Sequence, residues 1–230
     1  MSSIHQAIQK IRIIDNHEHI DPKEIRKKNR VDFFGLLHYL ESDLITAGMP
    51  RGLLNRASPL SAEEKASLFL KYFRRANNTA YARVFKTAMA DLYGMDDWTV
   101  DGVLKVNEKV KRATDDDNWY EYVLKEKSRI DLAITLAYTT DVDFSLFRPV
   151  MFFDFTFQLR RKSDLEQVEK ASGFSVHRFQ DYLNAVEVIM DRLVSEGMVA
   201  VKLGHGYWRP LKMTRPTFFE AERGLNRLLS

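Results

Sequence analysis

The chain has 230 residues, of which 45% are hydrophobic and 12% aromatic, enough for one large globular domain or two small ones. Its formal net charge of +3 is small for this length and gives no reason to expect a nucleic-acid or membrane partner. The lack of cysteine excludes disulfides, zinc–thiolate sites and thiol catalysis, so a metal site must use His, Asp, Glu or a modified Lys. Because the sequence has neither a secretory signal nor a run of about 18 apolar residues, the expected location is cytoplasmic.

The first candidate strand, residues 12–15, ends in Asp15 and leads into the pair His17 and His19. This apolar run predicts a buried strand, on which side chains two positions apart share a face with Cβ atoms roughly 6.6–7 Å apart. Two imidazoles at that separation can bind one divalent ion, and Asp15 could orient one of them. Glu18 is expected to point the other way. The alternative is a polar strand end with two solvated histidines.

Helical periodicity dominates from residue 31 to residue 127. Ser61 and Glu64 form the S-x-x-E pattern of a capping box. We therefore assign residues 1–30 and 128–230 to a sheet-forming part and residues 31–127 to a helical insertion, which is either a lid or an independent domain. Helices are expected at residues 3–10, from Asp21, at residues 33–40, 61–73, 78–93 and 99–112, and from Asp115.

Strand signals return after this helical stretch. Apolar runs at residues 130–136, 150–157 and 198–203 predict three more strands. A helix is expected over residues 175–196, closed by Gly197, and another over 217–229. Alternation of this type predicts an α/β fold with a parallel sheet that has helices on its faces.

Lys202 interrupts the last of these strands near its C-terminal end. A buried lysine is costly unless it is paired or chemically modified. A desolvated, neutral amine can add carbon dioxide and become a carbamate, whose oxygens bind metals. The other two interpretations are an ion pair with Asp154 and a direct contact between unmodified Lys202 and an anionic substrate.

The loop after Lys202 carries three further candidates for substrate binding. Arg209 could grip a substrate carboxylate bidentately, with Tyr207 beside it. The alternative for Arg209 is a surface residue stacked on Trp208. Of the remaining histidines, His205 is the best additional candidate because it directly follows the strand end.

Together these motifs resemble the amidohydrolase superfamily. The resemblance rests on H-x-H after an apolar strand, the helical insertion, and V-A-V-K-x-x-x-x-Y-x-R-P-L at residues 199–211. It is strongest to the branch of FluG-like proteins and to uronate isomerases. It implies a (β/α)8 TIM barrel that binds one or two divalent ions, above all zinc, through His17, His19 and Lys202. The chain matches only the first half of a family member, since the family's remaining ligands lie on strands five, six and eight.

Three functions follow from this resemblance. The first is a metal-dependent hydrolase that attacks an amide, ester or lactone of a small, carboxylate-bearing substrate with metal-activated water. The second is a sugar-acid isomerase of the uronate-isomerase kind. The third is a non-catalytic fragment or assembly module, because half of the expected ligands are missing. The expected partners are therefore a small substrate and either another copy of the chain or a missing C-terminal half.

Overall fold

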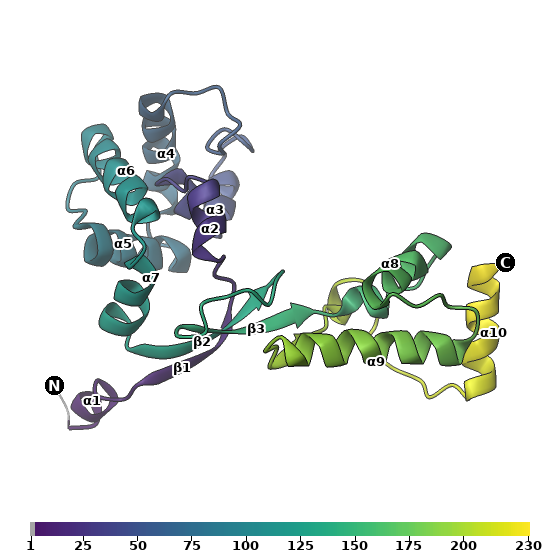
Figure 1. The fold of residues 1–230 in the computed structure, drawn as a ribbon. Helices are drawn as coiled ribbons and strands as arrows, with labels where there is room; N and C mark the ends of the chain where they lie inside the picture. The colour runs from purple at the N-terminus through teal and green to yellow at the C-terminus, as the bar shows by residue number, and fades with distance from the viewer. Residues whose placement is uncertain (1–2) are drawn as a thin grey trace. The chain divides into compact units, whose positions relative to one another are not determined.

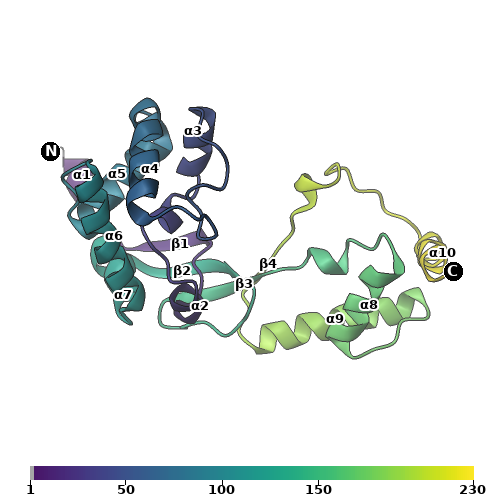
Figure 2. The same cartoon turned by 90° about the horizontal axis from the view of Figure 1, so that it is seen from above.

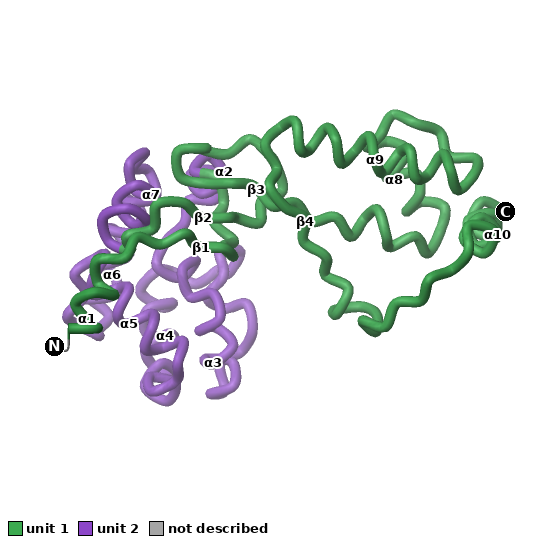
Figure 3. The backbone as a smooth tube through the Cα atoms, turned by 90° about the horizontal axis from the view of Figure 1, so that it is seen from below, with its two compact units in different colours: residues 1–22, 128–230 green, residues 23–127 purple. Residues whose placement is uncertain are grey.

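The computed structural model describes residues 3–230, which divide into two compact units. One unit comprises the described residues up to 22 together with residues 128–230 and is called the strand unit below. The other comprises residues 23–127 and is called the helical unit (Figure 3). No helix within residues 3–230 is long and apolar enough to cross a membrane.

The strand unit is built on four parallel strands in the order β1-β2-β3-β4, as Figure 2 shows. Their bounds are β1 Ile13–Glu18, β2 Ile130–Ala137, β3 Phe147–Phe152 and β4 Ala200–Lys202. The predicted α/β class and parallel sheet are confirmed. Since a TIM barrel has eight such strands, this sheet is a half-barrel.

The prediction that the first strand is buried is wrong. Ile13 and Ile14 are 38% and 66% exposed. The reason is position, because β1 lies at the edge of the sheet and pairs only with β2 among the described residues. An apolar run predicts a strand, but it does not show whether another part of the chain covers that strand.

The third strand begins and ends earlier than the predicted range of 150–157. It ends at Phe152, and a 3-10 turn at Asp154–Thr156 follows, labelled η3. The rings of Phe153, Phe155 and Phe157 contact one another through Phe153, at centroid distances of 5.9 Å. The aromatic residues that suggested a strand are thus used to pack this turn.

Three helices complete the strand unit's second half, namely α8 Lys162–Ser172, α9 Phe179–Ser195 and α10 Phe218–Leu229 (Figure 1). A short helix, α1 Ser3–Ile8, precedes β1. The helices α9 and α10 match two predicted ranges, whereas α8 fills the connection after Phe157, for which no element was predicted. A core cluster that includes Phe153, Leu165, Ile189 and Leu225 joins the end of β3 to all three helices.

The helical unit contains five α-helices of six residues or more. They are α2 Lys23–Lys28, α3 Leu40–Thr46, α4 Ala62–Ala76, α5 Ala80–Tyr93 and α6 Val100–Asp115. A 3-10 turn, η1 Phe34–Leu36, precedes α3, and α7 Trp119–Glu121 leads into a π-helical segment, η2 Tyr122–Lys127. The predicted capping box of Ser61 and Glu64 is present at the start of α4.

One predicted helix of this unit is interrupted. The 3–4 spacing over residues 33–40 predicted a continuous helix, but His38 has φ +44°, in the left-handed region. The chain instead forms η1, turns at His38 and starts α3 at Leu40. Phe33, Leu37 and Leu40 are nevertheless all buried, so the spacing identified the correct apolar face.

Candidate functional site

His17 and His19 lie at the C-terminal end of β1, where their imidazoles converge. Their Nε2 atoms are 3.1 Å apart and their ring centroids 5.1 Å apart. The ladder between β1 and β2 shifts register between Asp15 and Glu18, because Asp15 pairs with Ala133 and Glu18 with Thr135. Three residues therefore advance on β1 while two advance on β2, which is a β-bulge.

The bulge changes the environment of Glu18, which was expected to face away from the histidines' side of the strand. Glu18 instead interacts with the Asp15 side chain. Burial, the hydrogen bond to Asp15 and the charge of Asp15 raise the pKa of Glu18 to about 7. Asp15 itself accepts a hydrogen bond from the backbone N–H of His17, at 3.1 Å. It therefore holds the strand end through the backbone.

Lys202, on β4, reaches the same two imidazoles. Its Nζ lies 3.1 Å from Nε2 of His17 and 3.4 Å from Nε2 of His19. In a flat sheet β1 and β4 would lie about 14 Å apart, since three strand spacings of about 4.7–4.9 Å separate them. Because side chains stand roughly perpendicular to a sheet, these side chains would not meet across a flat one. The sheet is therefore curled, with these three side chains on its concave side.

The spacing of the three nitrogens fits a shared divalent ion. Nitrogen atoms about 2.0–2.1 Å from a tetrahedral zinc ion stand roughly 3.3 Å apart. The three distances here are 3.1, 3.1 and 3.4 Å, close to the edges of one face of that tetrahedron. A hydrogen bond in which one Nε2–H donates to the other Nε2 accounts for the histidine pair's spacing equally well. An ammonium at Lys202 and a metal ion would both contact the two imidazoles, but they exclude each other because like charges repel.

Asp154 does not form the ion pair with Lys202 that one interpretation expected. It is only 5% exposed, and both of its carboxylate oxygens accept hydrogen bonds from the loop after β4. The Gly204 N–H donates at 2.7 Å and the Trp208 Nε1–H at 3.1 Å. Asp154 therefore ties the end of β3 to the loop that directly follows Lys202.

The structure does not bring the other predicted site residues into contact with the cluster of His17, His19 and Lys202. His205 is buried, and its ring contacts Phe157 and Trp208 at centroid distances of 6.0 and 5.2 Å. Tyr207 is 87% exposed and Arg209 is exposed on the same loop. Their assignment to substrate binding stays a prediction.

Sequence reasoning missed Arg160. Its guanidinium lies over the ring of Trp208, 5.2 Å from the centroid, in the place expected for Arg209. The contact joins the segment before α8 to the loop after β4, and spacing along the chain gives no sign of it. Within residues 3–230, no group of three His, Asp or Glu side chains is placed to hold one metal ion.

No protein-family model and no curated protein matches this sequence. Among solved structures, the chain is similar to glucuronate isomerase from Caulobacter crescentus, with a TM-score of 0.74 and 16% identity. That match covers 96% of this chain and 51% of the isomerase. A second similar structure is uronate isomerase from Thermotoga maritima, with a TM-score of 0.66 and 16% identity over 85% of this chain and 47% of that one.

These similarities establish the fold. The chain is half of a TIM-type barrel and spans about half the length of both isomerases. At 16% identity the comparison carries no residue roles.

Proposed function

We propose that the chain carries part of the active site of a metal-dependent sugar-acid isomerase of the uronate-isomerase type. One observation carries the proposal: His17, His19 and Lys202 converge at the C-terminal ends of β1 and β4. Active sites of barrel folds lie at this end of the strands. The half-barrel is also similar in fold to two uronate isomerases.

In this proposal His17 and His19 would hold the metal through Nε2, and the ion would supply Lewis-acid polarisation of the substrate carbonyl. Lys202 contributes in one of two ways. As a neutral amine or carbamate it would be a further ligand. As an ammonium it opposes metal binding and contacts an anionic substrate instead.

In this proposal Arg209 and Tyr207 bind the substrate. Both lie on the exposed loop that follows β4, and a guanidinium can hold a carboxylate through two parallel hydrogen bonds. Isomerisation of an open-chain aldose moves a proton from C2 to C1 while the carbonyl passes from C1 to C2. The reaction therefore needs no oxidant, only a fixed substrate and a proton carrier.

Metal binding is tested by titrating the purified chain with Zn²⁺ and Mn²⁺ and counting bound ions by mass spectrometry. We expect His17→Ala and His19→Ala each to weaken binding at least tenfold. His177→Ala is the matched control, because His177 is an exposed histidine just before α9. Equal metal content in the unsubstituted chain and the three variants would contradict the proposed metal site.

Lys202→Met decides the role of the lysine by the sign of its effect. If Lys202 is a ligand, the substitution weakens metal binding. If it is an ammonium that competes for the two imidazoles, the substitution strengthens it. The matched control is the same substitution at an exposed lysine, Lys212→Met, in the loop before α10.

Activity is tested separately, with the metal-loaded chain, D-glucuronate and proton NMR in D₂O. The expected result is a ketose product with solvent deuterium incorporated next to the new carbonyl. Amide, ester and lactone substrates are screened in parallel, and hydrolysis without isomerisation would support the hydrolase interpretation. A metal-binding chain that converts none of these substrates would support the non-catalytic module, and light scattering then gives its oligomeric state.

A further inference from the structure

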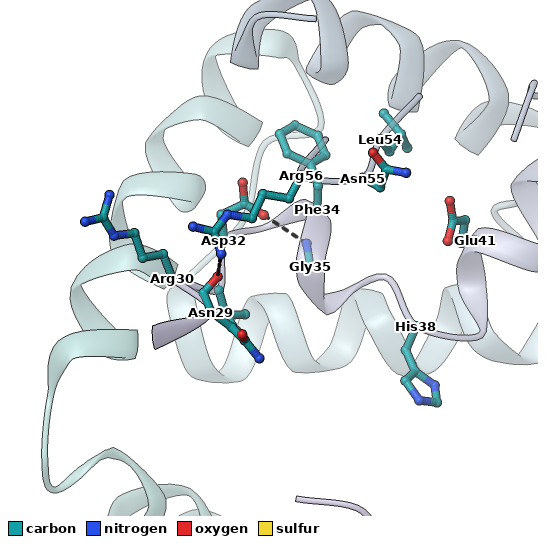
Figure 4. A pocket seen from close by; sticks show the side chains of 11 residues that line it. Asn29, Arg30, Asp32, Phe34, Gly35, His38, Glu41, Leu54, Asn55 and Arg56 are labelled. Atoms are coloured by element: carbon teal, nitrogen blue, oxygen red, sulfur yellow. Dashed lines mark hydrogen bonds between the residues drawn. The ribbon is translucent and has the colours of Figure 1, made fainter. Parts of the chain in front are cut away.

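The helical unit contains a cavity of about 340 Å³ that the proposed isomerase site does not use. It lies between the end of α2, the η1–His38 segment and residues 54–56 (Figure 4). Val31, Phe34 and Leu54 give it an apolar part. Its polar lining comes from Asn29, Arg30, Asp32, His38, Glu41, Asn55 and Arg56.

Two exposed arginines that line this cavity, and one buried lysine beside it, have no carboxylate partner. Among the described residues, Arg30, Arg56 and Lys65 form no ion pair. Lys65 is only 9% exposed, and its ammonium donates to the backbone oxygen of Asn55, at 2.9 Å, in the cavity wall. Burying a charge is expensive unless an opposite charge offsets it. An anion in the cavity would supply that charge.

Arg56 is already oriented for such a contact. Its Nη1 donates to the backbone oxygen of Asn29, at 2.9 Å, which fixes the guanidinium while leaving other N–H groups of the fork available. Figure 4 shows Arg30 and Arg56 on one side of the cavity and Glu41 on the other. A guanidinium fork held in this way suits the two oxygens of a carboxylate.

Backbone strain is concentrated at the same place. Arg30 and His38 have φ of +43° and +44°, and only one other non-glycine residue of the described chain, Arg129, has positive φ. Arg30 follows the end of α2, where a left-handed residue is usually glycine. A side chain at such a position carries a conformational cost, and strain of this kind gathers at ligand sites.

The acids in the lining set the charge of the ligand. Asp32 accepts a hydrogen bond from the Gly35 N–H at 2.9 Å, and Glu41 faces the cavity from the other side. These two carboxylates balance the charges of Arg30 and Arg56, and Lys65, which contacts the wall through the Asn55 carbonyl, adds one excess positive charge. The cavity therefore matches one negative charge at the arginine side and hydroxyl donors at the Glu41 side.

We propose that this cavity binds a small hydroxylated monocarboxylic acid, with its carboxylate on Arg56 and Arg30 and a hydroxyl group on Glu41. The same oxyanion contacts could be made by a phosphate group, so the two chemistries are separated by experiment. The proposal uses only residues of the helical unit. It is therefore independent of the metal site and of the isomerase activity.

The test is isothermal titration of the full chain with D-gluconate and, separately, with inorganic phosphate at low ionic strength. We expect gluconate to bind more tightly, Arg56→Gln to weaken it at least tenfold, and Arg56→Lys to weaken it less. Arg83→Gln, an exposed arginine of α5, is the matched charge control and should change nothing. The paired variant His17→Ala/His19→Ala should also bind normally.

Arg30→Gly provides a second, opposite readout. Glycine adopts positive φ without strain, so this variant should unfold at a higher denaturant concentration while binding gluconate more weakly. A side chain that serves only structure would not separate stability from binding in this way. The proposal is overturned if gluconate fails to bind at millimolar concentration, if phosphate binds more tightly, or if Arg56→Gln and Arg83→Gln bind alike.

Discussion

The helical unit and the strand unit use their apolar residues differently. In the helical unit, Phe33 and Phe69 are fully buried, and their rings meet at 5.3 Å in an edge-to-face arrangement. In the strand unit, Ile14 of β1 and Phe219 of α10 are 66% and 72% exposed. The first unit has closed its core within itself. The second places apolar strand and helix faces in contact with solvent, and its candidate metal ligands lie on the same sheet.

The comparison shows where stability and chemistry reside. Helices of the helical unit are fixed by caps and by contacts between neighbouring helices, which are close in sequence. The candidate site of the strand unit depends on Lys202 meeting His17 across 185 positions of chain. A change in the helical core should therefore lower stability, whereas a change at the strand ends should mainly alter the positions of the candidate site residues.

The largest expected effect is the loss of a core ring. Phe69→Ala removes a side chain that is fully buried among Phe33, Phe73 and Phe85, and truncations of this kind cost about 3–5 kcal/mol. Ile14→Ala, on the exposed face of β1, should change stability by no more than about 0.5 kcal/mol. Urea unfolding followed by circular dichroism measures both. Similar costs for the two variants would contradict the contrast between the units.

Asp154→Asn probes how the strand unit holds its site. The amide keeps the shape of the carboxylate but has one acceptor oxygen, so Gly204 N–H and Trp208 Nε1–H cannot both be satisfied. Leaving a buried donor unpaired costs about 1–3 kcal/mol. We also expect a change in Trp208 fluorescence and weaker metal binding, because the loop after Lys202 loses its anchor.

The exposed Asp141→Asn is the control for Asp154→Asn, since it also exchanges a carboxylate for an amide. An Asp154→Asn protein with normal metal affinity but reduced stability would show that Asp154 is structural only. A protein unchanged in both would show that the loop is held by its aromatic contacts.

Much of the fold was predictable because its signals are local. Apolar runs identified β2 and β4, and the S-x-x-E pattern identified the start of α4. The exposure of β1 was not predictable, because burial depends on which segment covers a strand. The bulge at Asp15–Glu18 was missed for the same reason, since register is a property of two strands.

The candidate site was partly predictable. Parallel strands bring their C-terminal ends to one edge, which led to grouping Lys202 with His17 and His19, and their nitrogen atoms do lie together. Their role as metal ligands stays a prediction. The partners of Asp154 were not predictable, because Gly204 lies 50 positions away and the choice between it and Lys202 is made by packing.

The smallest expected effect compares two capping boxes, one in each unit. Ser61 and Glu64 cap α4, and Thr217 and Glu220 cap α10. In each, hydrogen bonds from the backbone and side chain of the cap residue lower the pKa of the glutamate below its usual value of 4.5. A lowered pKa means that the charged form stabilises the fold at pH values above about 4.5. That contribution is lost as the pH falls through the folded-state pKa of the glutamate. In Glu64→Gln and Glu220→Gln, the stability of the capped helix should therefore depend less on pH in the acid range.

The two variants should nevertheless differ in what unfolds. The α4 helix buries Phe69, Leu70 and Phe73 in the core of its unit, so a weaker cap lowers the stability of the whole unit. The α10 helix buries only Leu225 among its residues, so a weaker cap should fray α10 alone. Amide hydrogen exchange at pH 6 separates the cases, because Glu64→Gln should speed exchange across α4, α5 and α6. Glu220→Gln should speed it only in the first turns of α10. Fast exchange throughout the strand unit in Glu220→Gln would mean that α10 supports that unit as strongly as α4 supports the other.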